Sequence, residues 1–182
     1  DQYGADAVRF FILSDSPPEK DVQWSEQGMI AAYKFVQKFW LLHKKITEEF
    51  KNKKRKNGNI DLTVYTNKLI QKYTVSLEKF NMNVLIAYLH ETYNFLSKEI
   101  EKLDIKDLKE NYSKILILMY PILPHLISEC IKDVKKIDTV SWPISQKEYL
   151  EEKFVNIVIQ INGKKKSLIK VEKNLSEKVL LE

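Results

Sequence analysis

The chain has 182 residues, 44% of them hydrophobic and 11% aromatic, which is enough apolar side chain to bury a core and excludes wholesale disorder. A single cysteine excludes a disulfide framework and every metal site built from several thiolates. The net charge of +5 is concentrated in residues 51–60 and in the tail 154–182, which excludes a histone-like protein that is basic throughout.

Apolar residues at helical spacing predict a bundle of helices in the first 134 residues. The expected helices cover residues 3–13, 25–50, 61–80, 85–100 and 105–120. Ser25 and Asp61 are placed to cap two of them, and Ser16-Pro17-Pro18 ends the first, because proline disfavours helical dihedrals in the residue before it. Pro121 interrupts the last pattern, so 122–134 is either a bent continuation or a helix of its own.

Two segments do not follow the helical pattern. Residues 51–59 contain no apolar side chain and predict a solvated loop. From Val155 to Val171 β-branched residues alternate on both sides of Asn162-Gly163, the strongest short signal for a β-hairpin. A lone hairpin is marginal in water, so the tail predicts the start of a small α+β piece, with a further helix beginning near Ser176.

The sequence offers little catalytic chemistry. Its three histidines, His43, His90 and His125, have no partner at metal-binding spacing, and we interpret them as structural or surface residues. There is no glycine-rich phosphate loop, nucleophile elbow or Cys/His dyad. Cys130 has apolar neighbours and is expected to be a buried, inert thiol of a cytosolic protein. We therefore predict no catalytic and no metal-binding residues, and the longest apolar stretch, 115–127, is too short for a membrane span.

A binding function is the better expectation. Two clusters of basic side chains are present: Lys53, Lys54, Arg55 and Lys56, and Lys164, Lys165 and Lys166. Such clusters fit contacts with a phosphate backbone, although lysine runs in loops often serve solubility alone. Trp24 and Trp142 could stack on bases, whereas Trp40 lies in an apolar stripe and is better explained as core.

Six motifs carry a resemblance to a known family. They are YGADAVRFF at 3–11, SPPEKDVQWSE at 16–26, FNMN at 80–83, YPILPH at 120–125, SWP at 141–143 and QINGK at 160–164. In this order they resemble the C-terminal part of the bacterial-type leucyl-tRNA synthetases, which are class I aminoacyl-tRNA synthetases. Isoleucyl and valyl enzymes share the Gly-Ala-Asp start but diverge before Pro17-Pro18 and Trp24.

The resemblance implies a mainly α fold: an anticodon-binding-type helical bundle followed by a truncated α+β piece with a β-hairpin. It divides the chain into a connection that follows the catalytic domain (1–24), the bundle (25–148) and the start of a small C-terminal domain (149–182). The parent enzyme would be cytoplasmic and would join leucine to tRNA(Leu) using ATP and Mg²⁺. Its catalytic and editing residues would lie upstream, with no cofactor in this fragment. The implied partners are tRNA(Leu) and the upstream catalytic domain, with no membrane and no DNA.

The resemblance also ranks the basic clusters, because the C-terminal domain of such enzymes is expected to reach the tRNA. Lys164 to Lys166 are therefore better RNA-binding candidates than the 51–56 run. The pair Asp6 and Arg9 either helps to dock the bundle on the catalytic domain or is a local helix ion pair.

Two alternatives stay open. The chain could be the same region of an isoleucyl- or valyl-type synthetase. It could also be a non-catalytic helical scaffold that docks a protein partner, which predicts an exposed apolar patch near Phe10, Phe11 and Trp24.

Overall fold

The computed structural model describes residues 2–15, 20–52, 58, 60–134, 140–150, 154–161 and 164–172. The chain divides into two compact units, Asp1–Ser145 and Gln146–Glu182. The domain bounds 1–24, 25–148 and 149–182 stay predictions. Each unit is described below by itself.

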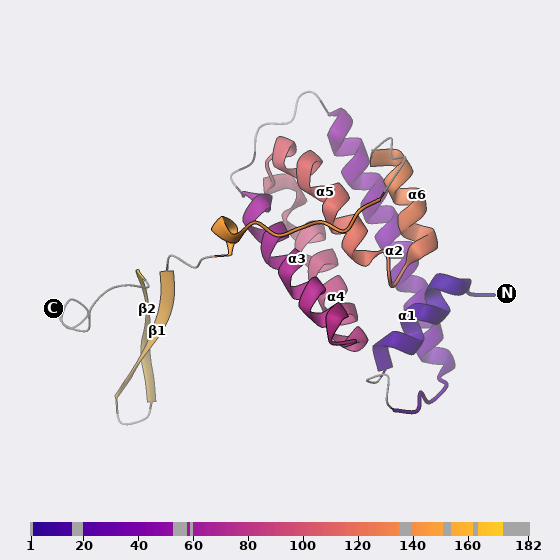
Figure 1. The fold of residues 1–182 in the computed structure, drawn as a ribbon, viewed down its shortest axis with the longest axis horizontal. Helices are drawn as coiled ribbons and strands as arrows, with labels where there is room; N and C mark the ends of the chain where they lie inside the picture. The colour runs from indigo at the N-terminus through magenta and orange to yellow at the C-terminus, as the bar shows by residue number, and fades with distance from the viewer. Residues whose placement is uncertain are drawn as a thin grey trace. The chain divides into compact units, whose positions relative to one another are not determined.

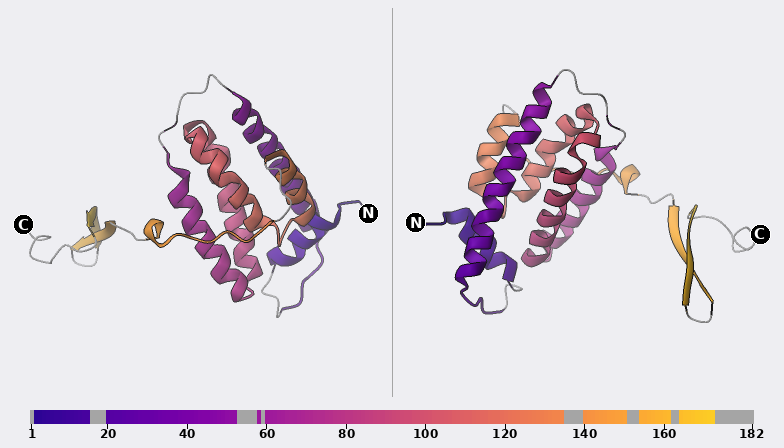
Figure 2. Two further views of the ribbon diagram at one scale, coloured as in Figure 1. Left: turned by 45° about the horizontal axis from the view of Figure 1, so that its top comes forward. Right: turned by 180° about the vertical axis from the view of Figure 1, so that it is seen from behind.

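The first unit is a bundle of α-helices (Figures 1 and 2). Its helices are α1 Ala5–Asp15, α2 Glu26–Lys51, α3 Leu62–Glu78, α4 Met82–Glu99, α5 Ile105–Met119 and α6 Pro124–Val134, with a 3-10 turn at Ile100–Lys102. Helix α1 packs on α2 and α4, α3 packs on α4 and α5, and α6 packs on α5 and α2. The predicted helical bundle is confirmed, and α6 is a helix of its own rather than a continuation of α5.

Three helices begin at side-chain caps supplied by the residue just before them. The Ser25 hydroxyl accepts a hydrogen bond from the backbone N–H of Gly28 at 3.2 Å, and the Asp61 carboxylate accepts from Thr63 at 2.7 Å. Asp104 caps α5 in the same way through the N–H of Lys106 at 2.8 Å. Because such caps satisfy backbone donors that the helix cannot pair itself, they set the starts of α2, α3 and α5 from local sequence.

Helix α6 is capped by a residue of the first helix, which is far away in the sequence. Asp6, on α1, accepts the backbone N–H of Leu126 at 2.7 Å and lies 2.9 Å from Nδ1 of His125. The same carboxylate pairs with Arg9 at 3.2 Å, and the Asp6 side chain is only 8% exposed. The local ion pair of the sequence interpretation is therefore present, but the carboxylate mainly serves to fasten α1 to the start of α6.

Close contact between α1 and α2 depends on Gly28. A Cβ built at this position would lie 2.5 Å from a ring carbon of Phe11, a distance at which one of the two must move. Phe11 and Phe10 are both buried in the core. Because glycine has no Cβ, the ring of Phe11 on α1 can pack directly against the backbone of α2 at Gly28.

The turn between α3 and α4 is made by Phe80, whose φ of 56° is in the left-handed region. The N–H of Phe80 donates to the carbonyl of Leu77 at 3.0 Å, and the N–H of Asn81 donates to that of Ser76 at 2.8 Å. These two bonds form a Schellman motif, in which glycine is the usual left-handed residue. The predicted helices 61–80 and 85–100 are indeed separated here, but the second one begins at Met82, earlier than predicted.

The second unit contains an antiparallel pair of strands, β1 Phe154–Ile161 and β2 Lys164–Glu172, after a 3-10 turn at Lys147–Tyr149. Ile157 pairs with Ile169, and the register shifts between Ile159 and Gln160. The predicted hairpin is therefore confirmed in its strands. Asn162, Gly163 and the expected helix start at Ser176 lie outside the described residues.

We predict that Asp6→Ala destabilises the bundle by about 2 kcal/mol, because it removes a helix cap and leaves the partly buried N–H of Leu126 without its acceptor. Urea unfolding followed by circular dichroism measures the change. Asp21→Ala removes an exposed carboxylate from the segment before α2 and is the matched control. Equal stability of the two variants would contradict the role assigned to Asp6.

Candidate functional site

The basic residues predicted in the tail lie at the start of β2. Lys164, Lys165 and Lys166 are the first three residues of this strand, and the side chain of Lys166 is exposed. Lys164 pairs with Ile161 and Lys165 with Gln160, next to the register shift in β1. The strand therefore brings three lysine positions together at one end of the hairpin.

The other predicted cluster, Lys53, Lys54 and Arg55, lies outside the described residues, as does Lys56. It belongs to the connection between α2 and α3, whose described neighbours are Asn52 and Gly58. Its assignment as an RNA contact stays a prediction from the sequence.

Sequence reasoning missed a third set of basic side chains, on α2. Lys34, Lys38 and Lys45 recur at helical spacing and are exposed. The signal was present, because no acidic residue occurs between Glu26 and Glu48. The net charge of residues 1–50 conceals it, since the acidic side chains toward both ends of this range outnumber the basic ones.

The most elaborate polar cluster is a buried structural clamp around His43. Its Nε2 lies 3.2 Å from the carboxylate of Asp133 on α6, and its Nδ1 lies 3.1 Å from the hydroxyl of Tyr112 on α5. Since a carboxylate only accepts, Nε2 carries the proton and Nδ1 accepts from the tyrosine. Lys44 donates to the same Asp133 oxygen at 2.7 Å and lies 4.3 Å from the ring centre of Trp40.

Burial lowers the pKa of His43 below its ordinary value, and the hydrogen bond to Asp133 only partly offsets this effect. The pKa of Asp133 is lowered by its hydrogen bonds with Lys44 and His43. A neutral histidine with both nitrogens engaged has no lone pair left for a metal ion or a substrate. This cluster ties α2, α5 and α6 together and is not a reaction centre.

The remaining chemically reactive side chains are inert or isolated. Cys130 is buried, and burial raises the pKa of its thiol to about 12, as expected from its apolar neighbours. His90 is exposed and contacts the rings of Phe10 and Phe35. Among the described residues no three His, Cys, Asp or Glu side chains gather as a metal site would require, and no helix is both long and apolar enough to cross a membrane.

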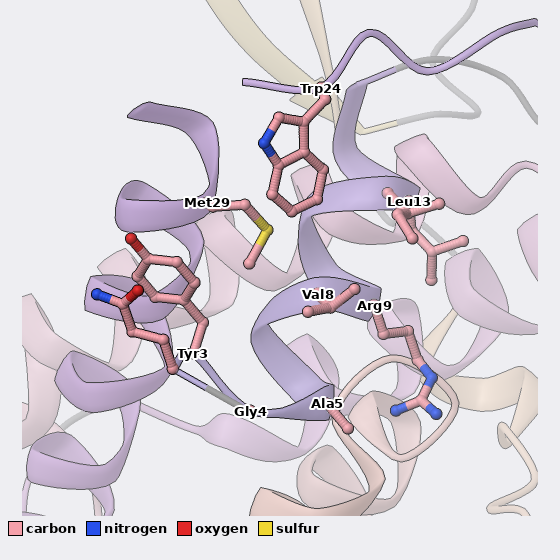
Figure 3. Close-up of a pocket in the computed structure, with 10 residues that line it drawn as sticks. Tyr3, Gly4, Ala5, Val8, Arg9, Leu13, Trp24 and Met29 are labelled. Carbon is pink, nitrogen blue, oxygen red and sulfur yellow. The ribbon is translucent and has the colours of Figure 1, made fainter. Parts of the chain in front are cut away.

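An open cavity of about 660 Å³ lies against α1 (Figure 3). Trp24 overhangs it, with Val8 and Met29 on its walls. Trp24 is 64% exposed, and its ring meets that of Phe11 edge-on at 5.5 Å. The prediction of an exposed patch is correct for Trp24 but wrong for Phe10 and Phe11, which the α1–α2 contact buries.

The other two tryptophans are partly buried and already engaged. Trp40 stacks on His43 at 5.5 Å and packs against the core, as its position in the apolar stripe indicated. Trp142 donates its Nε1–H to the hydroxyl of Thr74 at 2.9 Å, which holds the segment after α6 against α3. Neither is placed as an open stacking platform, whereas Trp24 is exposed.

Comparison with known proteins identifies the family. The sequence profile described as "Anticodon-binding domain of tRNA ligase" matches residues 61–181, from the cap of α3 into the tail. The chain belongs to this anticodon-binding family. The matched residues include α3 to α6 and both strands of the hairpin, and the mainly α fold class implied by the resemblance is confirmed.

Curated relatives of this anticodon-binding domain are named leucine–tRNA ligase. The protein of that name from Bartonella tribocorum is 32% identical over 99% of the chain and 22% of its own length. The one from Orientia tsutsugamushi is 36% identical over 91% of the chain and 20% of its own length. The resemblance to leucyl-tRNA synthetases is confirmed, and the chain spans about a fifth of the length of these relatives.

A solved structure shares the fold of this domain. It is the crystal structure of the ternary complex of Agrobacterium radiobacter K84 agnB2 LeuRS, tRNA and LeuAMS. Its TM-score is 0.79 at 20% identity, and the match covers 99% of this chain and 24% of that one.

Titration of His43 should make the bundle less stable in mild acid. Burial lowers the pKa of His43 in the folded state below 6.5, so at mildly acidic pH the unfolded chain binds a proton at this residue more readily than the folded chain does. The free energy of unfolding therefore falls as the pH drops below about 6.5. We expect the free energy of unfolding to fall more steeply between about pH 7.5 and 5.5 in the original chain than in His43→Gln. Urea titrations at several pH values measure this slope. Asp133 contributes only at lower pH, below its ordinary value of 3.8, and parallel curves for the two proteins would contradict the prediction.

Proposed function

We propose that this chain is the tRNA-binding C-terminal part of a leucine–tRNA ligase, whose full-length form charges tRNA(Leu) with leucine. The observation that carries the proposal is the similarity to leucine–tRNA ligases over 99% of the chain, through both the bundle and the hairpin. Eight curated relatives between 31% and 36% identical all bear that name, which favours leucine over the isoleucyl- and valyl-type alternatives.

Within this function Lys164, Lys165 and Lys166 are proposed as contacts to tRNA phosphates. Support comes from their consecutive positions at the start of β2 and from the exposure of Lys166. Lys53, Lys54 and Arg55 are proposed as weaker contributors. Phosphate contacts of this kind supply affinity and position without reading sequence, so no base-specific motif is needed.

Catalysis itself is assigned to the upstream domain of the same enzyme in the cytoplasm, which would use ATP and Mg²⁺. The residues of this chain do not fit either group, because there is no glycine-rich phosphate loop and the described residues hold no cluster of acidic ligands. We derive no chemical step from them. Their task is to bind and orient the RNA.

The apolar surface around Trp24 is proposed as the contact with that upstream catalytic domain. Ile12 and Trp24 line the cavity on α1 and are exposed, and Val22, two residues before Trp24, is exposed as well. An open apolar surface of this kind beside a cavity marks a place where another protein surface packs. We therefore assign the contact with the catalytic domain to the side chains around Trp24 and not to the Asp6–Arg9 pair.

A titration of the 182-residue chain with in vitro transcribed tRNA(Leu) tests RNA binding. If Lys164, Lys165 and Lys166 contact phosphates, these three alone should contribute about −2 to −3 to the slope of log K against log salt. Fluorescence anisotropy at several salt concentrations gives that slope. No binding at low salt, or an affinity that does not depend on salt, would overturn the proposed function.

The docking proposal predicts self-association of the isolated chain through the uncovered Trp24 surface. We expect Trp24→Ser to lower the association measured by sedimentation velocity at protein concentrations of about 50 µM. Ile144→Ser is the control, because Ile144 is 88% exposed in the segment after α6 and lies outside this surface. An original chain that sediments as a monomer, or an equal effect of both substitutions, would count against the assignment.

A further inference from the structure

Helix α2 carries a row of basic side chains along its outer surface. Lys34, Lys38, Leu41 and Lys45 follow one another at steps of four, three and four residues, so they share one face of the helix. All four are exposed, and Leu41 reaches 67%. Because an α-helix rises about 1.5 Å per residue, the row is about 16 Å long. We call these three lysines the α2 row.

No acidic side chain of α2 interrupts this row. The helix has acidic residues only near its ends, at Glu26, Glu48 and Glu49. Neither Lys34 nor Lys38 lies within 4 Å of a carboxylate of the described residues, and Lys45 meets Glu101 only at 3.8 Å, where both side chains are exposed. Lys44 points elsewhere, because Asp133 and Trp40 hold it.

The position of α2 leaves this face open. Seen from behind, α2 runs along the outside of the bundle (Figure 2, right). Its buried side is defined by residues such as Phe35, Phe39 and Ile46, which face the core. Phe35 meets the rings of His90 and Tyr93 at 4.5 and 5.5 Å, so the buried side of α2, and not the face that carries the row, faces α4.

We propose that the α2 row binds the sugar-phosphate backbone of a double-stranded stem of the tRNA. This inference rests on the proposed function and adds a site to it: a rigid, helix-borne contact in the bundle. RNA duplexes are recognised mainly through shape, phosphates and 2′-hydroxyls, and a straight row of exposed ammonium groups supplies that kind of contact.

The charge of the row favours RNA over a protein partner. Lysine is depleted in protein–protein interfaces relative to the rest of the surface, because its charge must be desolvated and its side chain ordered. Contacts with phosphates gain free energy by releasing counterions instead. The single apolar member, Leu41, is too small a surface to hold a protein partner by itself.

The test uses the 182-residue chain and labelled tRNA(Leu) in fluorescence anisotropy titrations. The variant Lys34→Gln/Lys38→Gln/Lys45→Gln should bind at least about tenfold more weakly at about 100 mM salt, with a salt slope shallower by about 2 to 3. The matched control is Lys106→Gln/Lys109→Gln/Lys114→Gln. It removes three exposed lysines from α5, where Asp107 and Glu110 lie among them, and should bind within about twofold of the original chain.

A charge-preserving variant separates binding from folding. Lys34→Arg/Lys38→Arg/Lys45→Arg should keep the affinity within about threefold, since arginine contacts phosphates as well as lysine does. Circular dichroism and thermal melts of every variant confirm that the bundle is folded.

Three outcomes would overturn the inference. If both glutamine variants weaken binding equally, the effect is one of total charge; if neither does, the α2 row is a solvated face. In both cases the proposed tRNA-binding function stands as long as the original chain binds with a steep salt dependence. If the original chain does not bind tRNA at all, the inference fails together with the proposed function.

Discussion

The bundle depends on one carboxylate that joins its first and last helices. Asp6 on α1 accepts the N–H of Leu126, 120 residues later in the sequence, and is almost completely buried while doing so. Without it, the partly buried N–H of Leu126 in the first turn of α6 would lose its acceptor. Because α6 also packs on α2 and α5, one hydrogen-bonded carboxylate holds the order of the whole bundle.

A second polar clamp holds the other end of α6. His43, Tyr112 and Asp133 link three helices through the two nitrogens of one imidazole ring. The residues between the two clamps, such as Ile127 and Cys130, are buried against the core. Helix α6 is thus fixed at both ends by directional contacts and along its length by packing, which makes the bundle a rigid support for whatever binds its surface.

The features that could be predicted from the sequence are those that depend on residues close together in the chain. Helix starts at Ser25 and Asp61 and the hairpin strands depend on neighbouring residues, and the structure has them where the sequence put them. The cap from Asp6 to α6 could not be found in this way, because its partners are distant in sequence. The α2 row can be seen in the sequence as lysines in a stretch without acidic residues, but the net charge of residues 1–50 does not reveal it. Burial of Phe10 and Phe11 required knowledge of the α1–α2 contact at Gly28.

The left-handed turn at Phe80 has a consequence for how this domain can vary in length. Only three residues separate α3 from α4, and the hydrogen bonds of Phe80 and Asn81 fix their backbone conformation. Each residue turns an α-helix by about 100°, so one insertion here would rotate all of α4 and carry Leu85 and Leu89 out of the core. The connection between α2 and α3 is longer, at ten residues, and lengthening a connection of that size costs little conformational entropy. Insertions and deletions in related domains are therefore expected in that connection and not at Phe80.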